Sequence, residues 1–167
     1  CLYVFANENA TRAPVDWITP SESVTLVQPT TAITHAKGTG YGFNGVDNYV
    51  RLPRLLSTYA PYSTNSAAAY VHVAAGTANN LIVGPEASGS TRLALQPTNG
   101  TNMVGGVNSS SLPAIGANTT IAGRYIWTRP NSTQISGYRN GSLVGTVAQS
   151  ASAPSNQSAA VCVGRTP

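Results

Sequence analysis

Short runs of β-branched and aromatic residues, separated by clusters of Gly, Pro, Asn and Ser, recur along this chain of 167 residues. Such runs are typical of β-strands, and the clusters between them are typical of turns. No window sustains the apolar spacing that an amphipathic helix of useful length requires. The pattern therefore predicts an all-β fold, with strands at residues 2–5, 23–27, 41–43, 49–52, 69–74, 80–83, 92–96, 101–104, 121–128, 134–139, 142–147 and 160–163.

The length and the number of strands favour one domain. A chain of this size can bury a substantial core, and about twelve short strands suit two sheets packed face to face. We therefore expect a single β-sandwich domain over residues 1–167, with N-terminal strands and an arm in residues 1–37.

The clearest strand covers residues 121–128. Tyr125 and Trp127 share one of its faces, whereas Arg124 and Ile126 share the other. Because both faces carry apolar residues, the pattern predicts a central strand that is covered on one side and partly covered on the other.

Two Asn-Gly pairs predict hairpins. Asn140-Gly141 and Asn99-Gly100 each stand between two expected strands, and Asn-Gly is the strongest sequence signal for a tight β-turn between antiparallel strands. Together with the strand at 121–128, the first pair predicts three consecutive antiparallel strands.

The balance of charges argues against two classes of partner. Charged residues make up only 8% of the chain, so the surface is expected to be mainly neutral Ser, Thr and Asn. The net charge of +4 reflects scarce acids, and the Lys and Arg residues are too dispersed for a nucleic-acid footprint. No apolar stretch has the length of a membrane-spanning helix. We expect neither nucleic-acid binding nor a membrane span.

Cys1 and Cys162 are the only cysteines and lie near opposite ends of the sequence, within apolar runs. A disulfide between them would enclose nearly the whole chain, with a stabilisation of ~4–5 kcal/mol in the loop-closure model. It would imply an oxidising compartment. An N-terminal cysteine is also the lipid-bearing residue of bacterial lipoproteins, and this alternative stays open.

Asparagines heading Asn-x-Ser/Thr triplets without proline are numerous, and such triplets are acceptors for N-linked glycans. They are Asn9, Asn99, Asn108, Asn118, Asn131, Asn140 and Asn156. A chain this rich in Asn, Ser and Thr also produces such triplets by chance. Together with the cysteines, they favour an extracellular, cell-surface or virion-surface location.

Three stretches resemble one family of sandwich domains. Residues 41–53, YGFNGVDNYVRLP, resemble the opening signature of concanavalin A-like, laminin G-like domains. Residues 138–145, YRNGSLVG, resemble a later hairpin of these domains, and residues 161–165, VCVGR, resemble the strand that follows it. The matches keep the family's order over roughly residues 38–165. The resemblance implies a two-sheet antiparallel jelly-roll sandwich of the lectin–glucanase superfamily.

The resemblance also leaves one sheet position without a strand. Such domains usually have a further strand that pairs near the opening signature, whereas this sequence ends at Pro167. Residues 2–5, held by a disulfide, are one candidate for the position. A strand from another chain is the other candidate, because an open sheet edge is a template for strand addition.

Acids and histidines are too few to form a recognisable catalytic or metal site. The acids are Glu8, Asp16, Glu22, Asp47 and Glu86. None forms the strand-spaced pair of related glucanases, and His35 and His72 lack triad partners or zinc-ligand spacing. Some relatives bind calcium, but Asn44 and Asn48 replace acids in the signature and suit turns. We expect no enzymatic activity, no cofactor and no metal.

Tyr59, Tyr62 and Asn65 form a candidate ligand-binding group, because relatives recognise sugars through aromatic and amide side chains on loops. The two tyrosines could equally pack over a sheet end with their hydroxyls in water. Trp17 and Trp127 are expected to be packing residues.

Two functions remain after these exclusions. The first is a non-catalytic structural subunit of an extracellular or virion surface assembly, such as a capsid, fibre or filament, whose partners are other protein subunits joined in part by strand addition. The alternative is a lectin-like module for carbohydrate or protein recognition and adhesion, whose partners include glycans.

Overall fold

The computed structural model describes residues 23–28, 32–36, 40–42, 49–55, 65–71, 84–85, 92–152 and 158–161. Within these residues strands are the only regular secondary structure, which confirms the all-β prediction. The strands are β1 Thr25–Val27, β2 Thr34–Ala36, β3 Gly40–Gly42, β4 Tyr49–Leu55, β5 Asn65–Val71, β6 Gly84–Pro85, β7 Arg92–Gln96, β8 Asn102–Ser109, β9 Ala114–Ala117, β10 Gly123–Asn131, β11 Gln134–Arg139, β12 Ser142–Ala148 and β13 Ser158–Val161.

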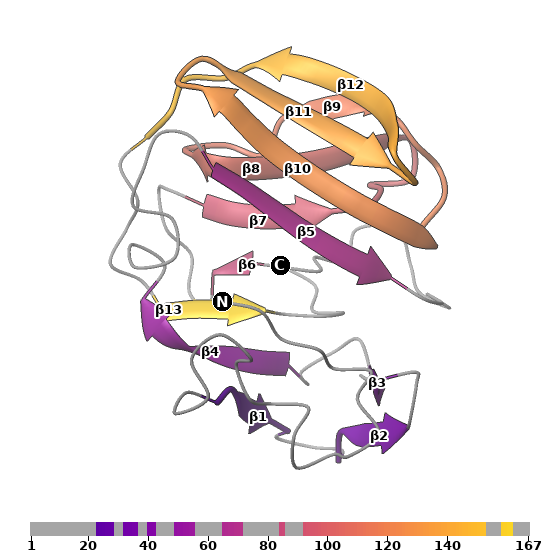
Figure 1. Cartoon of the computed structure of the whole chain (residues 1–167), viewed down its shortest axis with the longest axis vertical. Helices are drawn as coiled ribbons and strands as arrows, with labels where there is room; N and C mark the ends of the chain where they lie inside the picture. The colour runs from indigo at the N-terminus through magenta and orange to yellow at the C-terminus, as the bar shows by residue number, and fades with distance from the viewer. Residues whose placement is uncertain are drawn as a thin grey trace.

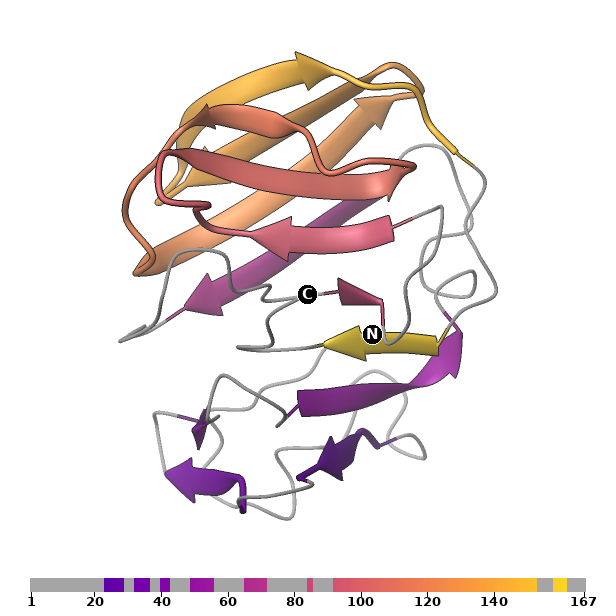
Figure 2. The ribbon, with the colours of Figure 1, turned by 180° about the vertical axis from the view of Figure 1, so that it is seen from behind.

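All pairings between these strands are antiparallel. One sheet has the order β12-β11-β10-β5, a second has the order β7-β8-β9, a third has the order β1-β4-β13-β6, and β2 pairs with β3. Seen from opposite sides in Figures 1 and 2, the first two sheets lie face to face. This two-layer part is called the sandwich below.

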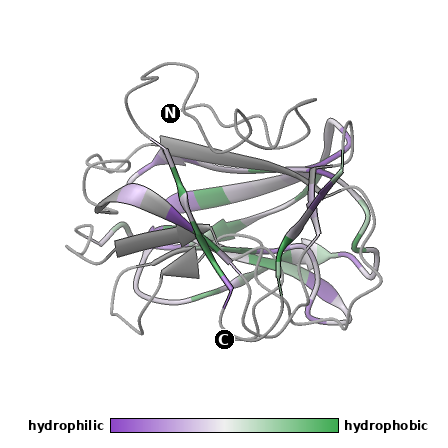
Figure 3. Ribbon diagram, turned by 90° about the horizontal axis from the view of Figure 1, so that it is seen from below, coloured by the Kyte–Doolittle hydropathy of each residue, from purple (hydrophilic) through white to green (hydrophobic). Residues whose placement is uncertain are grey.

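Alternate residues of the facing strands fill the core of the sandwich. The buried members are Leu95, Met103, Val107, Ile115, Tyr125, Trp127 and Ile135, with Val144 and Val147 packed against them. The rings of Tyr125 and Trp127 stack with their centroids 5.5 Å apart. Figure 3 shows hydrophobic and hydrophilic segments following one another along the strands. Burial of this apolar surface is the main favourable contribution to folding.

Strand β10 has one buried and one exposed face, as its sequence predicts. Tyr125 and Trp127 are buried, whereas Arg124 and Ile126 are exposed. β11 and β5 flank β10 on its two sides, so it is a central strand of its sheet.

The Asn140-Gly141 turn has the geometry that its sequence predicts. Both residues have positive φ, 50° and 84°, as a two-residue turn between twisted antiparallel strands requires. The Asn140 side chain also holds the turn against the start of β10, because its Oδ1 accepts a hydrogen bond from the Arg124 backbone nitrogen at 3.0 Å. The β10, β11 and β12 strands are therefore consecutive antiparallel neighbours, as expected.

The Asn99-Gly100 pair also joins two antiparallel strands, β7 and β8. Here the turn is longer than two residues, and the Asn99 backbone nitrogen donates to the Asn102 carbonyl at 2.9 Å. Gly100 has φ of 104°, a conformation that glycine tolerates best.

The sequence missed β2, β6 and β9, and it misplaced the limits of several other strands. β9 has the sequence AIGA, with one β-branched residue, so its β-propensity is low. β5 begins four residues before the expected start at position 69. The expected strands at residues 2–5 and 80–83 lie outside the described residues.

Strand β4, which carries part of the family-like signature, is flanked on both sides. It pairs with β1 on one side and with β13 on the other. Among the described residues, Val50 and Arg51 of β4 therefore have a partner in both neighbouring strands, and the outer strands of this sheet are β1 and β6.

The two sheets approach closely where β9 passes β12. A Cβ atom built on Gly145 would overlap the Ile115 carbonyl oxygen and lie 3.1 Å from the Gly116 Cα. A Cβ atom on Gly116 would in turn overlap the Val144 carbonyl oxygen. Backbone atoms cannot rotate away as side-chain ends do, so both positions require glycine.

Candidate functional site

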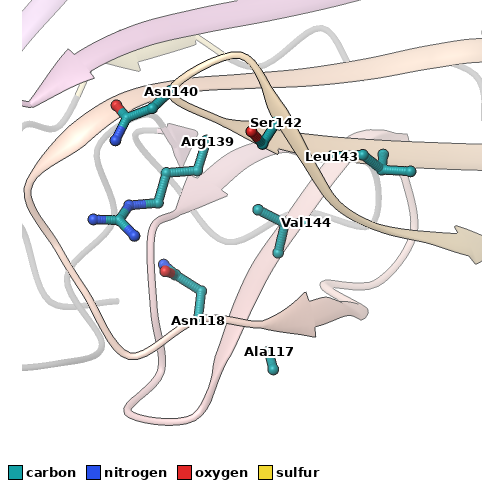
Figure 4. Close-up of a pocket in the computed structure, with 7 residues that line it drawn as sticks. All are labelled: Ala117, Asn118, Arg139, Asn140, Ser142, Leu143 and Val144. Atoms are coloured by element: carbon teal, nitrogen blue, oxygen red, sulfur yellow. The ribbon is translucent and has the colours of Figure 1, made fainter.

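A depression of about 410 Å³ opens at one end of the sandwich. It lies between the end of β9 and the β11–β12 hairpin, two segments from different sheets (Figure 4). Its lining residues are Ala117, Asn118, Arg139, Asn140, Ser142, Leu143 and Val144. We call this depression the hairpin pocket.

Arg139 supplies the positive charge of the hairpin pocket. Its Nη2 donates to the Ala122 carbonyl at 3.1 Å, whereas its Nε is buried and has no hydrogen-bond partner within the described residues. The side chain runs over Gly123, where a Cβ atom would lie only 3.3 Å from Nε. Gly123 has φ of 150°, which also disfavours a side chain. The guanidinium is therefore held at the mouth with an unused donor.

Asn118 forms the opposite wall and is held in one orientation. Its side-chain nitrogen donates to the Pro97 carbonyl at 2.6 Å and to the Thr120 carbonyl at 2.8 Å. Its backbone nitrogen donates to the Thr101 carbonyl at 2.9 Å. In Figure 4 the Asn118 amide extends toward the Arg139 guanidinium. Because both amide protons are used, the side chain is left with its oxygen as an acceptor.

No carboxylate within the described part of the chain neutralises Arg139. The described residues contain the arginines Arg51, Arg54, Arg92, Arg124, Arg129 and Arg139, and they contain neither Asp nor Glu. The described residues also contain no group of three His, Cys, Asp or Glu side chains that could hold a metal. The hairpin pocket thus offers a cation, amides and a hydroxyl group, which can bind an anionic or polar ligand.

A second exposed feature lies on the outer face of the β12-β11-β10-β5 sheet. Ile126, Tyr138 and Leu143 are cross-strand neighbours in the register, and they form a row across three strands. Ile126 is 41% exposed and Leu143 is 59% exposed. We call these three residues the apolar row.

Polar hydroxyl groups border the apolar row on one side. Two positions further along β10 and β11, and so on the same face, stands a row formed by Thr128, Ser136 and Thr146. The Ser136 and Thr146 hydroxyls lie 3.1 Å apart. At the other end of the face, Arg124 is the one arginine that β10 exposes within the described residues. This face is therefore nearly neutral and is apolar at its centre.

The candidate sugar-binding residues from the sequence are not brought to the hairpin pocket. Tyr59 and Tyr62 lie outside the described residues. Asn65 pairs in register with Arg129, at the opposite end of β10 from Gly123. Sequence reasoning missed Asn118 and Arg139 as ligand-binding residues, because it could not place β9 against the hairpin.

The other sequence-predicted sites are described only in part. His35 lies in β2 and packs edge-on against Tyr41 with ring centroids 5.0 Å apart. Burial raises the pKa of Tyr41 above its ordinary value, since the phenolate is penalised by desolvation. Cys1, Cys162 and the expected disulfide lie outside the described residues. Trp127 is a buried packing residue, as expected.

The structure separates the asparagines of the glycosylation triplets into two groups. Asn99, Asn131 and Asn140 are exposed. Asn108 is fully buried, and Asn118 is 8% exposed with its amide nitrogen bonded to backbone. Asn9 and Asn156 lie outside the described residues. At Asn108 and Asn118 the fold leaves no room for a glycan, because both side chains are buried.

We predict that the folded protein carries glycans at Asn99, Asn131 and Asn140 when it is made in a glycosylating host, and none at Asn108 or Asn118. Glycopeptide mass spectrometry of the folded, secreted fraction measures the occupancy of each site. A substantial occupancy of Asn108 in that fraction would contradict the packing of β8 described above.

Comparisons with known proteins give no family for this chain: no family model, no curated protein and no solved structure matches it. The described part of the chain also includes no helix that is long and apolar enough to cross a membrane.

Proposed function

We propose that this protein is a non-catalytic structural subunit of an extracellular or virion surface assembly, built on a concanavalin A-like jelly-roll sandwich. The observation that carries the proposal is the apolar row of Ile126, Tyr138 and Leu143 on a nearly neutral sheet face. Exposed apolar residues that gather in one place, within a polar surround, are typical of protein interaction sites. The disulfide expected between Cys1 and Cys162 and the glycosylation triplets support an extracellular location.

The partner that best fits this face is a second copy of the chain. Two sheets can pack face to face through such surfaces, and a two-fold axis would set one apolar row on the other. The two Arg124 side chains would then lie at opposite ends of the paired faces, since Arg124 stands to one side of the row. A pair of identical faces therefore meets without repulsion between like charges.

Replacing Leu143 with Lys is expected to weaken self-association at least tenfold. The substitution removes the burial of one leucine, about 1.5–3 kcal/mol, and it places a charge in the interface. Sedimentation velocity over a concentration series measures the effect.

The matched control is Thr119→Lys, which adds the same charge to an exposed residue in the loop after β9. It should self-associate like the unmodified protein. If the unmodified chain stays monomeric at all concentrations, or if both variants behave alike, the assembly role of this face is wrong.

The hairpin pocket favours the alternative function, a lectin-like recognition module. An apolar face supports assembly without a ligand, but a concave site with a charged group, two amides and a hydroxyl is typical of small-ligand binding. The two functions are compatible, because the pocket and the apolar row are separate except for Leu143.

A further inference from the structure

The hairpin pocket holds a cationic side chain with a buried, unused donor. We infer that the hairpin pocket binds the carboxylate of an acidic sugar through Arg139; the inference rests on the recognition function proposed above as the alternative. It names the class of ligand, which neither the sequence nor the fold provides.

The charge of Arg139 selects an anion. A guanidinium presents its donors in a planar fork that matches the two oxygens of a carboxylate, and such paired hydrogen bonds are stronger than bonds between neutral groups. Here Nη2 bonds only to a backbone carbonyl, and Nε is buried with no partner within the described residues. Because the buried Nε cannot be reached from the pocket, a bound carboxylate would accept from the two terminal nitrogens, Nη1 and Nη2.

The remaining lining residues fit a sugar ring better than a simple anion. Asn118 provides an amide oxygen, Ser142 provides a hydroxyl, and Leu143 provides exposed apolar surface. Ring hydroxyls pair with the first two groups, and the C–H face of a ring can lie against the third. The volume of about 410 Å³ lies within the range of roughly 300–1,000 Å³ typical of small-ligand sites.

The site is held in place before a ligand arrives. The Asn118 side chain is tied to Pro97 and Thr120, and the Asn140 Oδ1 accepts from the Arg124 backbone. Arg139 is tied to the Ala122 carbonyl. A ligand therefore loses little affinity to the ordering of these side chains.

The test is a titration of the unglycosylated full chain with N-acetylneuraminic acid and glucuronic acid, against glucose and acetate, by NMR. We expect the two acidic sugars to shift the backbone amide signals of residues 117–118 and 139–144, with at least tenfold tighter binding than glucose or acetate. Arg139→Gln should weaken acidic-sugar binding at least tenfold, and Arg139→Lys should weaken it as well because the fork is lost.

The matched control is Arg124→Gln, which removes an exposed arginine from the other face of the sheet. It should change the affinity by less than twofold. The amide spectrum of each variant shows whether it is folded, and the titration of the unmodified chain locates the site without any variant.

The outcomes distinguish a failure of the acidic-sugar assignment from a failure of the recognition function. If glucose binds as tightly as the acidic sugars and Arg139→Gln has no effect, the role of Arg139 is wrong while the recognition function stands. If acetate binds as tightly as the acidic sugars, the site takes a carboxylate alone and the sugar assignment is wrong. If none of the four ligands shifts any signal, the lectin-like function itself is overturned.

Discussion

Replacing Arg129 with Met is expected to lower the free energy of unfolding by about 2–4 kcal/mol. Arg129 is 1% exposed, although it carries a charge. Its Nε donates to the Val107 carbonyl at 2.6 Å, and its Nη1 donates to the Gln149 carbonyl at 2.7 Å and to the Ser132 carbonyl at 3.3 Å. One side chain thus joins β8 to the turn after β10 and to the segment after β12.

The size of this effect follows from two opposing contributions. Leaving buried carbonyls without donors costs about 1–3 kcal/mol for each group. Removing the buried charge offsets part of this destabilisation, because burial of a guanidinium is itself unfavourable. In addition, Nη2 of Arg129 has no partner within the described residues. The same desolvation lowers the pKa of Arg129 below its ordinary value. The lost hydrogen bonds dominate, because the bond to the Val107 carbonyl is buried and the bonds to the Gln149 and Ser132 carbonyls are partly buried.

Thermal and urea unfolding measure the change, and Arg124→Met is the matched control. Arg124 lies on the same strand but is exposed, so the same substitution should change stability by about 0.5 kcal/mol or less. Arg129→Lys should recover only part of the stability, because an ammonium group cannot reproduce the planar fork. Equal stability of Arg129→Met and the unmodified chain would show that these hydrogen bonds do not hold the sheets together.

Replacing Gly145 with Ala is expected to cost about 3 kcal/mol or more, even though it adds a single methyl group. The new Cβ would overlap the Ile115 carbonyl oxygen and approach the Ile115 carbonyl carbon at 3.0 Å. Since these are backbone atoms of β9, the two sheets must separate to admit the methyl group. Overpacking of this kind typically costs about 1–3 kcal/mol and occasionally more.

The control for this substitution is Ala148→Val, which adds carbon atoms at an exposed position of the same strand. Its effect should stay within about 0.5 kcal/mol. Urea unfolding of the two variants compares them directly. A Gly145→Ala protein as stable as the control would mean that β9 and β12 do not approach as closely as the structure shows.

Local sequence patterns predicted the elements whose structure depends on local chemistry. The alternation through Tyr125 and Trp127 predicted β10 and its buried face, because side chains alternate along any strand. The Asn140-Gly141 pair predicted its turn, because few residues accept positive φ in succession. In both cases the residues that decide the structure are neighbours in the chain.

The features that sequence reasoning missed depend on residues far apart in the chain. β9 forms from small residues because β8 supplies its hydrogen-bonding partner, and Gly116 fits because Gly145 lies opposite. The burial of Arg129 was not predicted, since its acceptors are backbone carbonyls of residues up to 22 positions away. Every residue has a backbone carbonyl, so the sequence does not show which carbonyls accept hydrogen bonds from Arg129.

The hairpin pocket was unpredictable for the same reason. Arg139 and Asn118 belong to different sheets, and they meet only because β9 ends beside the β11–β12 hairpin. In the sequence, Asn118 is recognisable as part of a glycosylation triplet, and Arg139 is one of several dispersed cations. Neither pattern indicates that the two side chains line one depression.

The most direct test of the proposed assembly is hydroxyl-radical footprinting of the unmodified chain below and above the concentration at which it self-associates. The proposal predicts that Ile126, Tyr138 and Leu143 are oxidised more slowly in the associated state, whereas the half-buried Leu112 in the opposite sheet's loop keeps its rate. Unchanged oxidation of the apolar row in an associated sample would contradict the account, because the copies would then meet through another surface.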